Sequence, residues 1–365
     1  MKVLLVDLET EWRGGQNQAL LLLKGLRDRG HGAELVAADG SALGERARAA
    51  GIEVHSTSRG LFRVPAARKI RGLLRSGDFE IVHANEAHAV TAAWLALWQR
   101  REGSRVPLVI SRRVGYPIGK SVIAQARYRA AARIVAISRW SAERVLGSGI
   151  PADKVTIVYE GVELPAPLSA QRRAEARSRF GVAKDEPLLG CVGALSPDKG
   201  QEWLIRALAK SREKFPSAKL LLAGTGPCRE RLQKIAQEVG VGDAVIFAGF
   251  ISDVESVYAA LDVFLLPSFF EALSNALMSA MAYAIPSVAF NLGGPAEIIE
   301  DGRSGLLVEP ANVDALCTAI AKILDDATLA ISLGESGRQR IEQNFSATNM
   351  VGEMLHVYGE CLKKG

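Results

Sequence analysis

The sequence has few of the features that mark several large protein classes. Four cysteines occur among 365 residues, all in the second half and none in a CxxC pair. Disulfide frameworks and zinc sites need denser, regularly spaced cysteines, so we predict reduced thiols, typical of a cytoplasmic protein. No apolar run approaches the roughly 18–20 residues of a membrane span. The first residues, MKVLLVDLETEWRGG, predict a strand and not a signal peptide.

Aromatic residues are sparse at 6%, and the basic residues are dispersed over many segments. This combination disfavours nucleic-acid binding, which uses clustered basic side chains and aromatic stacking. The charge is nevertheless uneven, because residues 1–163 hold 25 Lys and Arg against 16 Asp and Glu, whereas the remainder holds 20 against 24. A basic first half is compatible with peripheral contact to an anionic membrane or an anionic acceptor, and also with a merely solvated surface.

Short apolar runs alternate with helical stretches along the whole chain. The runs that predict strands are 2–7, 33–37, 53–55, 81–84, 108–111 and 134–138, then 188–192, 219–223, 245–247 and 263–266. A polar segment with Gly and Pro, YEGVELPAPLSA, separates the two series and reads as a linker. We therefore predict two α/β domains, each a doubly wound parallel sheet that binds ligands at the carboxyl ends of its strands.

Residues 265–284, LLPSFFEALSNALMSAMAYA, predict a strand, a turn and a capped helix. Pro267 ends the strand, Glu271 lies in the turn, and Ser274 or Asn275 is suited to cap the helix. Backbone N–H groups at such a helix start are free to hold a phosphate. The local residues alone fit an ordinary strand–helix–strand unit equally well.

Two glycines, Gly14 and Gly15, follow the first strand in a predicted loop over 9–18, ahead of a helix predicted over 17–29. The pair is similar to part of a dinucleotide fingerprint, but the full GxGxxG is missing. A tight turn explains it equally well. A dehydrogenase would also need an acidic residue at the end of the second strand, which is not clear here.

Polar residues follow two further strands of the first domain. His83, Asn85, Glu86 and His88 surround the end of the strand at 81–84. Histidines five apart do not share a helical face, and no cysteine accompanies them, so we predict no metal site. The adjacent pair 112–113, both arginines, offers fork-shaped donors to a phosphate or carboxylate. We expect Arg112 and Arg113 to contact the acceptor, with a solvated loop as the alternative.

Taken in order, several motifs resemble those of the retaining glycosyltransferases of family 4. They are HANEAHA (83–89), GALSPDKG (193–200), GTGP (224–227), GFISDV (249–254), FEALSNALMSAMA (270–282) and GGPAEII (293–299). The resemblance implies the GT-B fold, with two Rossmann-like domains facing across a cleft. It implies an acceptor-binding domain over 1–163, a nucleotide-sugar-binding domain over 164–345, and a C-terminal helix over 346–365 that returns to the first domain.

The resemblance also implies roles for individual residues. His88 would contact the donor sugar, Glu271 would bind its hydroxyls, and Lys199 would hold the diphosphate, making these three the catalytic set. The donor, a UDP- or GDP-linked sugar used as substrate and not as cofactor, would be bound by Gly14, Gly15, Gln16, Ala194, Gly224, Gly226, Pro227, Phe250, Ile251, Val254, Leu273, Ser274, Asn275 and Ser279. The donor loops contain no Asp-x-Asp motif, so we predict metal-independent transfer.

Two positions depart from the family pattern. Ala194 stands where the family has Arg, and Ser279 stands where it has a second Glu that holds the ribose. A serine could still make one weaker hydrogen bond to the ribose. We therefore keep three hypotheses: an active retaining transferase for a glycan, lipid or lipopolysaccharide acceptor; a non-catalytic sugar-nucleotide-binding relative; and another enzyme on Rossmann-like domains, such as a sugar-nucleotide epimerase or a dehydrogenase.

Overall fold

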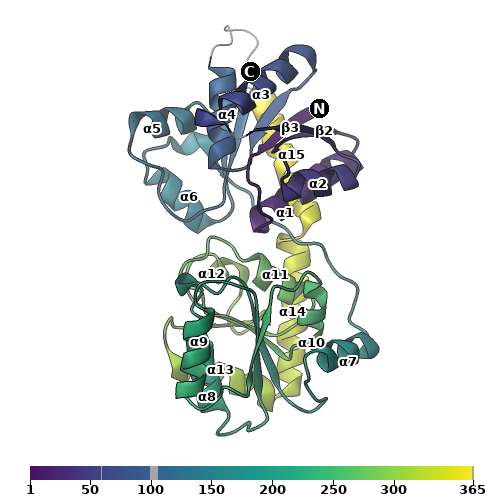
Figure 1. Ribbon diagram of the computed structural model, residues 1–365, viewed down its shortest axis with the longest axis vertical. Helices are drawn as coiled ribbons and strands as arrows, with labels where there is room; N and C mark the ends of the chain where they lie inside the picture. The colour runs from purple at the N-terminus through teal and green to yellow at the C-terminus, as the bar shows by residue number, and fades with distance from the viewer. Residues whose placement is uncertain (59, 99–105, 364–365) are drawn as a thin grey trace. The chain divides into compact units, whose positions relative to one another are not determined.

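The computed structural model describes residues 1–58, 60–98 and 106–363 (Figure 1). Its contacts divide the chain into two compact units. Unit 1 comprises Met1–Gly161 and Ala347–Gly365, and unit 2 comprises Val162–Ser346. The boundaries predicted at residues 163 and 345 lie within two residues of these limits. No helix among the described residues is long and apolar enough to cross a bilayer.

A seven-stranded parallel sheet forms the centre of unit 1, in the order β3-β2-β1-β4-β5-β6-β7. The order reverses between β1 and β4, and in such sheets a ligand crevice opens where the order reverses. The strands are β1 (Lys2–Asp7), β2 (Gly32–Ala38), β3 (Glu53–Thr57), β4 (Ile81–Ala84), β5 (Leu108–Arg112), β6 (Arg133–Ala136) and β7 (Val155–Ile157).

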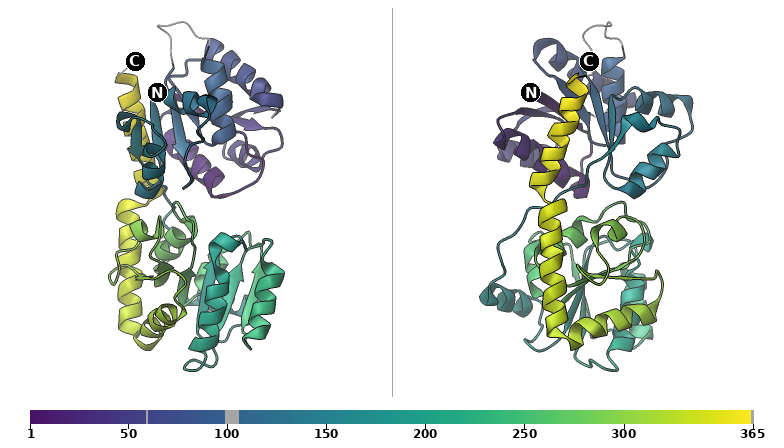
Figure 2. Two further views of the ribbon diagram at one scale, coloured as in Figure 1. Left: turned by 90° about the vertical axis from the view of Figure 1, so that its left-hand side faces the viewer. Right: turned by 180° about the vertical axis from the view of Figure 1, so that it is seen from behind.

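Helices cover both faces of this sheet because side chains alternate along each strand. Leu4 and Val6 of β1 pack in the layer with α3, α4 and α5. Val3 and Leu5 pack in the layer with α1, α2 and α15, the last being the yellow helix that lies along unit 1 in Figure 2. The helical elements are α1 (Gly14–Asp28), α2 (Ala42–Ala49), η1 (Leu61–Arg63), α3 (Val64–Ser76), α4 (Ala87–Leu97), α5 (Val122–Arg129), α6 (Arg139–Leu146), η2 (Ala152–Lys154) and α15 (Ala347–Lys363).

The predicted glycine loop of unit 1 is wrong, because Gly14 and Gly15 are the first two residues of α1. The backbone N–H of Gln16 donates to the Arg13 carbonyl at 3.1 Å, so the helical turn begins at once. The amide of Asn85 approaches the Gly15 carbonyl at 3.3 Å, which brings α1 beside the end of β4. The glycine pair therefore belongs to the first turn of a helix and not to a loop.

Serine side chains cap the starts of two further helices of unit 1. Helix α6 begins at Arg139, because the Ser138 hydroxyl accepts from the backbone N–H of Ser141 at 3.1 Å. Helix α5 begins at Val122, because the Ser121 hydroxyl accepts from the backbone N–H of Ala124 at 3.2 Å.

A six-stranded parallel sheet forms the centre of unit 2, in the order β10-β9-β8-β11-β12-β13. The strands are β8 (Leu188–Val192), β9 (Lys219–Ala223), β10 (Val245–Gly249), β11 (Val263–Leu266), β12 (Ser287–Phe290) and β13 (Leu306–Val308). The helical elements are α7 (Ala170–Arg179), η3 (Pro197–Lys199), α8 (Gln201–Ser211), α9 (Arg229–Glu238), α10 (Val254–Ala260), α11 (Asn275–Ala282), α12 (Pro295–Ile298), α13 (Val313–Asp325) and α14 (Ala327–Asn344).

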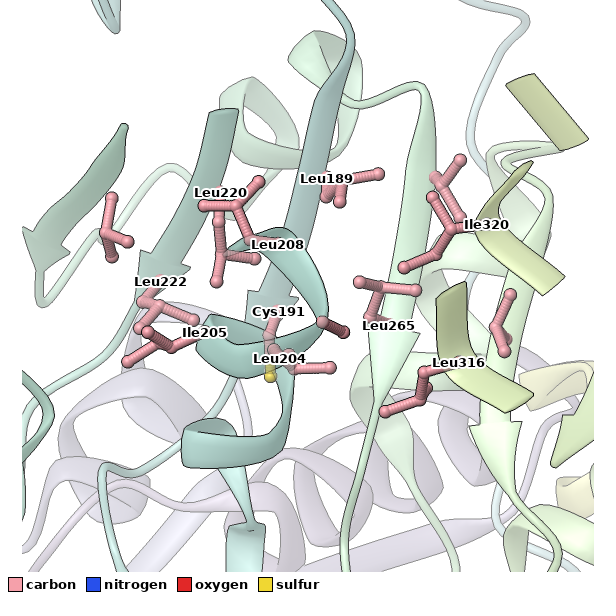
Figure 3. Close-up of a cluster of buried hydrophobic side chains, with 14 of the residues drawn as sticks. Leu189, Cys191, Leu204, Ile205, Leu208, Leu220, Leu222, Leu265, Leu316 and Ile320 are labelled. Carbon is pink, nitrogen blue, oxygen red and sulfur yellow. The ribbon is translucent and has the colours of Figure 1, made fainter. Parts of the chain in front are cut away.

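The core of unit 2 packs helices onto one face of this sheet. Figure 3 shows the side chains that meet there: Leu189, Cys191, Leu220, Leu222 and Leu265 from the strands, and Leu204, Ile205, Leu208, Leu316 and Ile320 from α8 and α13. Burial of such side chains stabilises the sheet by about 25 cal/mol for each Å² of apolar surface. All four cysteines of the chain are free thiols. Apolar packing therefore stabilises each unit, and the loops at the strand ends can carry functional side chains.

Candidate functional site

The carboxyl ends of four neighbouring strands of unit 2 carry most of the residues that the sequence singled out. Because β10, β9, β8 and β11 are adjacent and parallel, the loops that follow them lie along one edge. The backbone N–H of Phe269, in the loop after β11, donates to the Asp198 carbonyl in the loop after β8 at 2.8 Å. This edge therefore brings together side chains that are about seventy residues apart in the sequence.

A lysine and a glutamate form the charged centre of this edge. Lys199 ends η3, Glu271 lies in the turn after β11, and Lys199 Nζ lies 2.5 Å from Glu271 Oε2. Both side chains are mostly buried, at 22% and 17% exposed. Burial raises the pKa of Glu271, and the adjacent Lys199 ammonium opposes that change. The pair forms a charged centre in which each group holds the other in place.

Glycines bring the loops after β8 and β9 into direct contact. A Cβ at Gly224 would lie 1.9 Å from the Gly193 carbonyl oxygen, and one at Gly226 would lie 2.3 Å from the Leu195 carbonyl oxygen. The Gly224 N–H also donates to the Gly249 carbonyl at 2.8 Å, which joins the loop after β9 to that after β10. The sequence Gly-x-Gly is therefore required by close backbone approach along this edge.

The loop after β10 exposes apolar side chains at this edge. Phe250 is 74% exposed, Ile251 is partly exposed, and Val254 begins α10 at 43% exposed. Pro227 is exposed in the neighbouring turn. Exposed apolar side chains next to glycine turns provide a surface on which a planar ring can pack.

The start of α11 supplies backbone donors next to Glu271. Ser274 is the cap, since its side chain accepts from the backbone N–H of Leu277, and Asn275 is the first helical residue. Leu273 and Ser274 are buried, whereas Asn275 is partly exposed. The first N–H groups of a helix have no partner within the helix and favour an anion.

The two positions that depart from the family pattern have different surroundings. Ala194 is exposed on the loop after β8, and its carbonyl accepts from the Gln201 side chain at 2.8 Å. Ser279 is partly buried on α11, beside Tyr258, whose hydroxyl donates to the Ala276 carbonyl at 3.2 Å. Ala194 leaves room for a larger side chain, while Ser279 lies against another side chain of unit 2.

The carboxyl edge of unit 1 contains a polar network that the sequence analysis missed in part. Asp7, the last residue of β1, is fully buried, and its Oδ2 accepts from the Asn85 amide at 2.6 Å and the Gln16 amide at 3.1 Å. Burial raises the pKa of Asp7, while the two amide donors oppose the change. The sequence signal that could have revealed this network is the carboxylate of Asp7 directly after the apolar run 3–6.

Arg112 and Arg113, the pair predicted to contact the acceptor, donate hydrogen bonds to partners within unit 1. Arg112 is buried, and its guanidinium donates to the Tyr116 carbonyl at 2.6 Å. Arg113 donates to Glu160 Oε1 at 2.7 Å and to Asn85 Oδ1 at 2.5 Å. Both guanidinium groups therefore have partners within unit 1, and their contact with the acceptor stays a prediction.

Glu86 caps α4, and His88 lies in the first turn of that helix. The Glu86 carboxylate accepts from the backbone N–H groups of Leu8 at 3.1 Å and Ala89 at 2.7 Å, and also from that of His88. Burial and the nearby Asp7 carboxylate raise the pKa of Glu86 to about 7, although these N–H donors favour the charged form. The cap fixes the position of His88.

His88 has two close neighbours that the sequence analysis did not identify. Arg63 Nη2 lies 2.8 Å from His88 Nδ1, and Glu9 Oε1 lies 3.6 Å from His88 Nε2. His88 itself is 42% exposed. Residues 9 and 63 carried no motif, and only the fold brings them to the start of α4.

The sequence is similar to those of known proteins along most of its length. Residues 12–165 match the family described as Glycosyltransferase Family 4, and residues 172–340 match the Glycosyl transferases group 1. A GDP-mannose-dependent alpha-(1-6)-phosphatidylinositol monomannoside mannosyltransferase of Mycolicibacterium smegmatis is 31% identical over 313 residues, covering 80% of each chain. The chain belongs to glycosyltransferase family 4. The alternative of an epimerase or a dehydrogenase is therefore set aside.

Two further relatives define how far the similarity reaches. An uncharacterized glycosyltransferase of Methanocaldococcus jannaschii is 31% identical over 232 residues, which span 62% of this chain and 59% of that relative. HepE of Anabaena, crystallised in complex with UDP, has the same fold with a TM-score of 0.84 at 22% identity, covering 99% of this chain and 100% of that one. This family 4 chain therefore has the predicted GT-B fold.

Proposed function

We propose that this family 4 chain transfers a sugar from a nucleotide sugar to an acceptor with retention of the anomeric configuration. The observation that carries the proposal is the Lys199–Glu271 pair, 2.5 Å apart at the carboxyl edge of unit 2 and bordered by the glycine turns. A cation for a diphosphate and a carboxylate for sugar hydroxyls are the two groups that such a transfer requires.

Lys199, Glu271 and His88 would each have a separate role in the transfer. The Lys199 ammonium would neutralise the charge that develops on the departing diphosphate, together with the N–H groups of Leu273 to Asn275. The Glu271 carboxylate would accept hydrogen bonds from the sugar hydroxyls. In unit 1, His88 would contact the same sugar. Ground-state pairing of Lys199 with Glu271 holds both side chains in the site before the donor binds.

The donor is proposed to be a UDP- or GDP-linked sugar. HepE was crystallised with UDP, whereas the mycobacterial relative is named as GDP-mannose-dependent. The exposed Phe250 loop and the turn at Gly224 to Pro227 would line the base and the phosphates. A thermal-shift panel of UDP, GDP and ADP with the wild-type protein and Lys199→Ala tests this assignment. A shift by one nucleotide that is absent from the variant supports it, and equal shifts in both proteins contradict it.

Transfer is proposed to be metal-independent. Among the described residues, Glu9, Glu86 and His88 place possible ligand atoms within 4.8 Å of one another. The oxygens of Glu86 already accept from backbone N–H groups, and Arg63 lies against Nδ1 of His88. The Glu86 oxygens and the Nδ1 atom of His88 are therefore engaged in hydrogen bonds and are not arranged around a cation. Turnover that is unchanged in excess EDTA supports the proposal, and turnover abolished by EDTA and restored by a divalent ion contradicts it.

The acceptor is proposed to be a glycan or lipid-linked molecule reached from an anionic membrane surface. Helix α3 is amphipathic, with Arg68, Lys69 and Arg75 exposed and Ile70 buried, and Leu61 just ahead of it is 79% exposed. Basic residues beside an exposed apolar side chain suit an interface with anionic lipids. Co-sedimentation with phosphatidylserine vesicles should weaken in an Arg68→Gln, Lys69→Gln variant but not in Lys210→Gln, Lys214→Gln, which changes two lysines of unit 2.

A non-catalytic sugar-nucleotide-binding protein is the second candidate, favoured by Ala194 and Ser279. Both replace charged residues of the family pattern, which would weaken the donor site. Release of free nucleoside diphosphate from the bound donor decides between the candidates. NMR of the product anomer then decides whether the configuration is retained. Binding without release, with both soluble and lipid acceptors, would favour the second candidate.

A further inference from the structure

Ser268 carries a buried hydroxyl group that has no hydrogen-bond partner among the described residues. The residue lies in the turn between β11 and α11 and is 1% exposed. Most buried hydroxyl groups in folded proteins have a partner, because an unpaired donor in the interior has lost its bonds to water. The Ser268 hydroxyl is therefore a candidate for a role in another state of the site.

Two backbone contacts place Ser268 beside the loop that carries Lys199. The N–H group of the residue after Ser268 donates to the Asp198 carbonyl at 2.8 Å. On the other side of Ser268, a Cβ at Gly200 would lie 2.3 Å from the Pro267 carbonyl oxygen, so the two backbones touch there as well. The turn that contains Ser268 therefore lies directly against η3, which ends in Lys199.

In the resting site the carboxylate of Glu271 is paired with a cation and not with this hydroxyl. Lys199 Nζ lies 2.5 Å from Glu271 Oε2. Burial raises the pKa of Glu271, the Lys199 ammonium opposes this change, and the Ser268 hydroxyl opposes it more weakly, whereas the Asp198 carboxylate adds to the increase. The hydroxyl is thus near the carboxylate, but it does not form a hydrogen bond of normal geometry with it.

A buried carboxylate that loses its cation needs another donor, since an uncompensated charge in the interior is costly. We propose that the Ser268 hydroxyl is this donor and bonds to Glu271 when Lys199 turns to the diphosphate. Ser268 is then a positioning residue that acts through Glu271, because its own oxygen is buried. The proposal rests on the function proposed above, in which Lys199 holds the diphosphate of the nucleotide sugar.

The exchange of donors is tested without a ligand, by a double-mutant cycle of thermal midpoints at pH 8. In the wild-type background, Ser268→Ala removes a hydroxyl that has no partner, so the midpoint should stay the same or rise. In Lys199→Ala, where Glu271 has lost its cation, the same change should lower the midpoint by roughly 3–10 °C. Lys199→Met, which keeps an apolar stem, serves as the second background if Lys199→Ala does not fold. Equal effects of Ser268→Ala in both backgrounds would overturn the proposal.

Ser211 is the matched control for this cycle. Its hydroxyl is also buried without a hydrogen-bond partner among the described residues. It is the last residue of α8, whereas Lys199 lies just before the first residue of that helix. Ser211→Ala should therefore have the same effect in the wild-type and Lys199→Ala backgrounds. A coupling for Ser211 as large as that for Ser268 would contradict a specific bond to Glu271.

Ligand binding and turnover test the role of Ser268 in the reaction. Ser268→Ala should weaken binding of the nucleoside diphosphate and lower kcat by roughly 10-fold each, because Glu271 then lacks a donor once Lys199 is engaged. The acid limb of the kcat profile should move to higher pH, because loss of the hydroxyl raises the pKa of Glu271. Ser211→Ala should keep wild-type values. Wild-type binding and an unchanged pH profile in Ser268→Ala would overturn the proposal.

The two tests separate the possible failures. If the double-mutant cycle is as expected but no nucleotide binds, the proposed function fails while the exchange of donors at Glu271 stands. If a donor turns over and Lys199→Ala abolishes turnover, but Ser268→Ala matches the wild type in every measurement, the function stands and the role of Ser268 fails.

Discussion

Nδ1 of His83 lies 2.6 Å from the Tyr358 hydroxyl, although the two residues are 275 positions apart. His83 belongs to β4 and Tyr358 to α15, and both are fully buried. Nε2 of the same ring lies 2.8 Å from the Ser111 hydroxyl of β5. The C-terminal helix is thus joined to the strand that leads into Asn85 and His88.

Removing the Tyr358 hydroxyl should destabilise unit 1. Tyr358→Phe leaves a buried imidazole nitrogen without its partner, which costs about 1–3 kcal/mol. Urea denaturation followed by circular dichroism measures the change in the free energy of unfolding. Tyr116→Phe, at a ring that is 56% exposed in the same unit, is the matched control and should change little. Equal stability of the two variants would contradict this account of the network.

Unit 1 should lose stability in mild acid because of His83. Burial, assisted by the charge of Arg113, lowers the pKa of His83 from 6.5 to about 3. Below pH 6.5 the imidazole binds a proton in the unfolded chain but not in the folded chain, which favours the unfolded state. The free energy of unfolding therefore has its full value above pH 6.5 and decreases as the pH falls toward 3. The loss is about 1.4 kcal/mol per pH unit. His83→Gln should show a shallower decline, and identical pH profiles would argue against the linkage.

Lys199 should be required for turnover and much less for folding. Lys199→Ala removes the cation beside Glu271, and the loss of such a group lowers kcat by roughly 100- to 1,000-fold. The fold should persist, because Lys199 is not part of the apolar core of unit 2, although the thermal midpoint should fall because Glu271 is left buried without its cation. Lys210→Ala, at an exposed lysine paired with Asp314, should retain wild-type turnover. Turnover in Lys199→Ala comparable to that of Lys210→Ala would remove Lys199 from the mechanism.

Restoring the family residue at position 194 should strengthen donor binding. Ala194 is exposed, so Ala194→Arg adds a guanidinium without burying a charge. One hydrogen bond to a diphosphate would tighten nucleotide binding by roughly 10-fold, measured by calorimetry. Ala194→Gln is a control of similar length without the charge. Equal affinities for both variants would mean that the diphosphate lies elsewhere.

Gly224 should tolerate no side chain. Its φ is 149°, and the new methyl group of Gly224→Ala would lie 1.9 Å from the Gly193 carbonyl oxygen. The loops after β8 and β9 would have to separate, with weaker nucleotide binding measured by calorimetry. Gly240→Ala is a control, because its φ is also positive, at 74°, but open space surrounds it. Loss of binding in Gly240→Ala alone would contradict the close-approach explanation.

The sequence by itself determined most of the strands, the two α/β units and most of the donor loops. Buried parallel strands are continuous apolar runs, and five of the predicted runs, 2–7, 81–84, 188–192, 219–223 and 263–266, coincide with strands β1, β4, β8, β9 and β11. The glycine turns were readable because close backbone approach leaves glycine as the residue that fits.

The tertiary structure alone decided which polar residues meet. Arg63, Glu9 and His88 come from three segments with no common motif, and they meet because α3 and α4 pack side by side beyond the end of β1. Arg112 and Arg113 were predicted to contact the acceptor, and only the fold shows that they also donate to partners within unit 1, the Tyr116 carbonyl and Glu160. Spacing in the sequence predicts the elements, since periodicity is local, whereas pairing of side chains depends on distances that the fold creates.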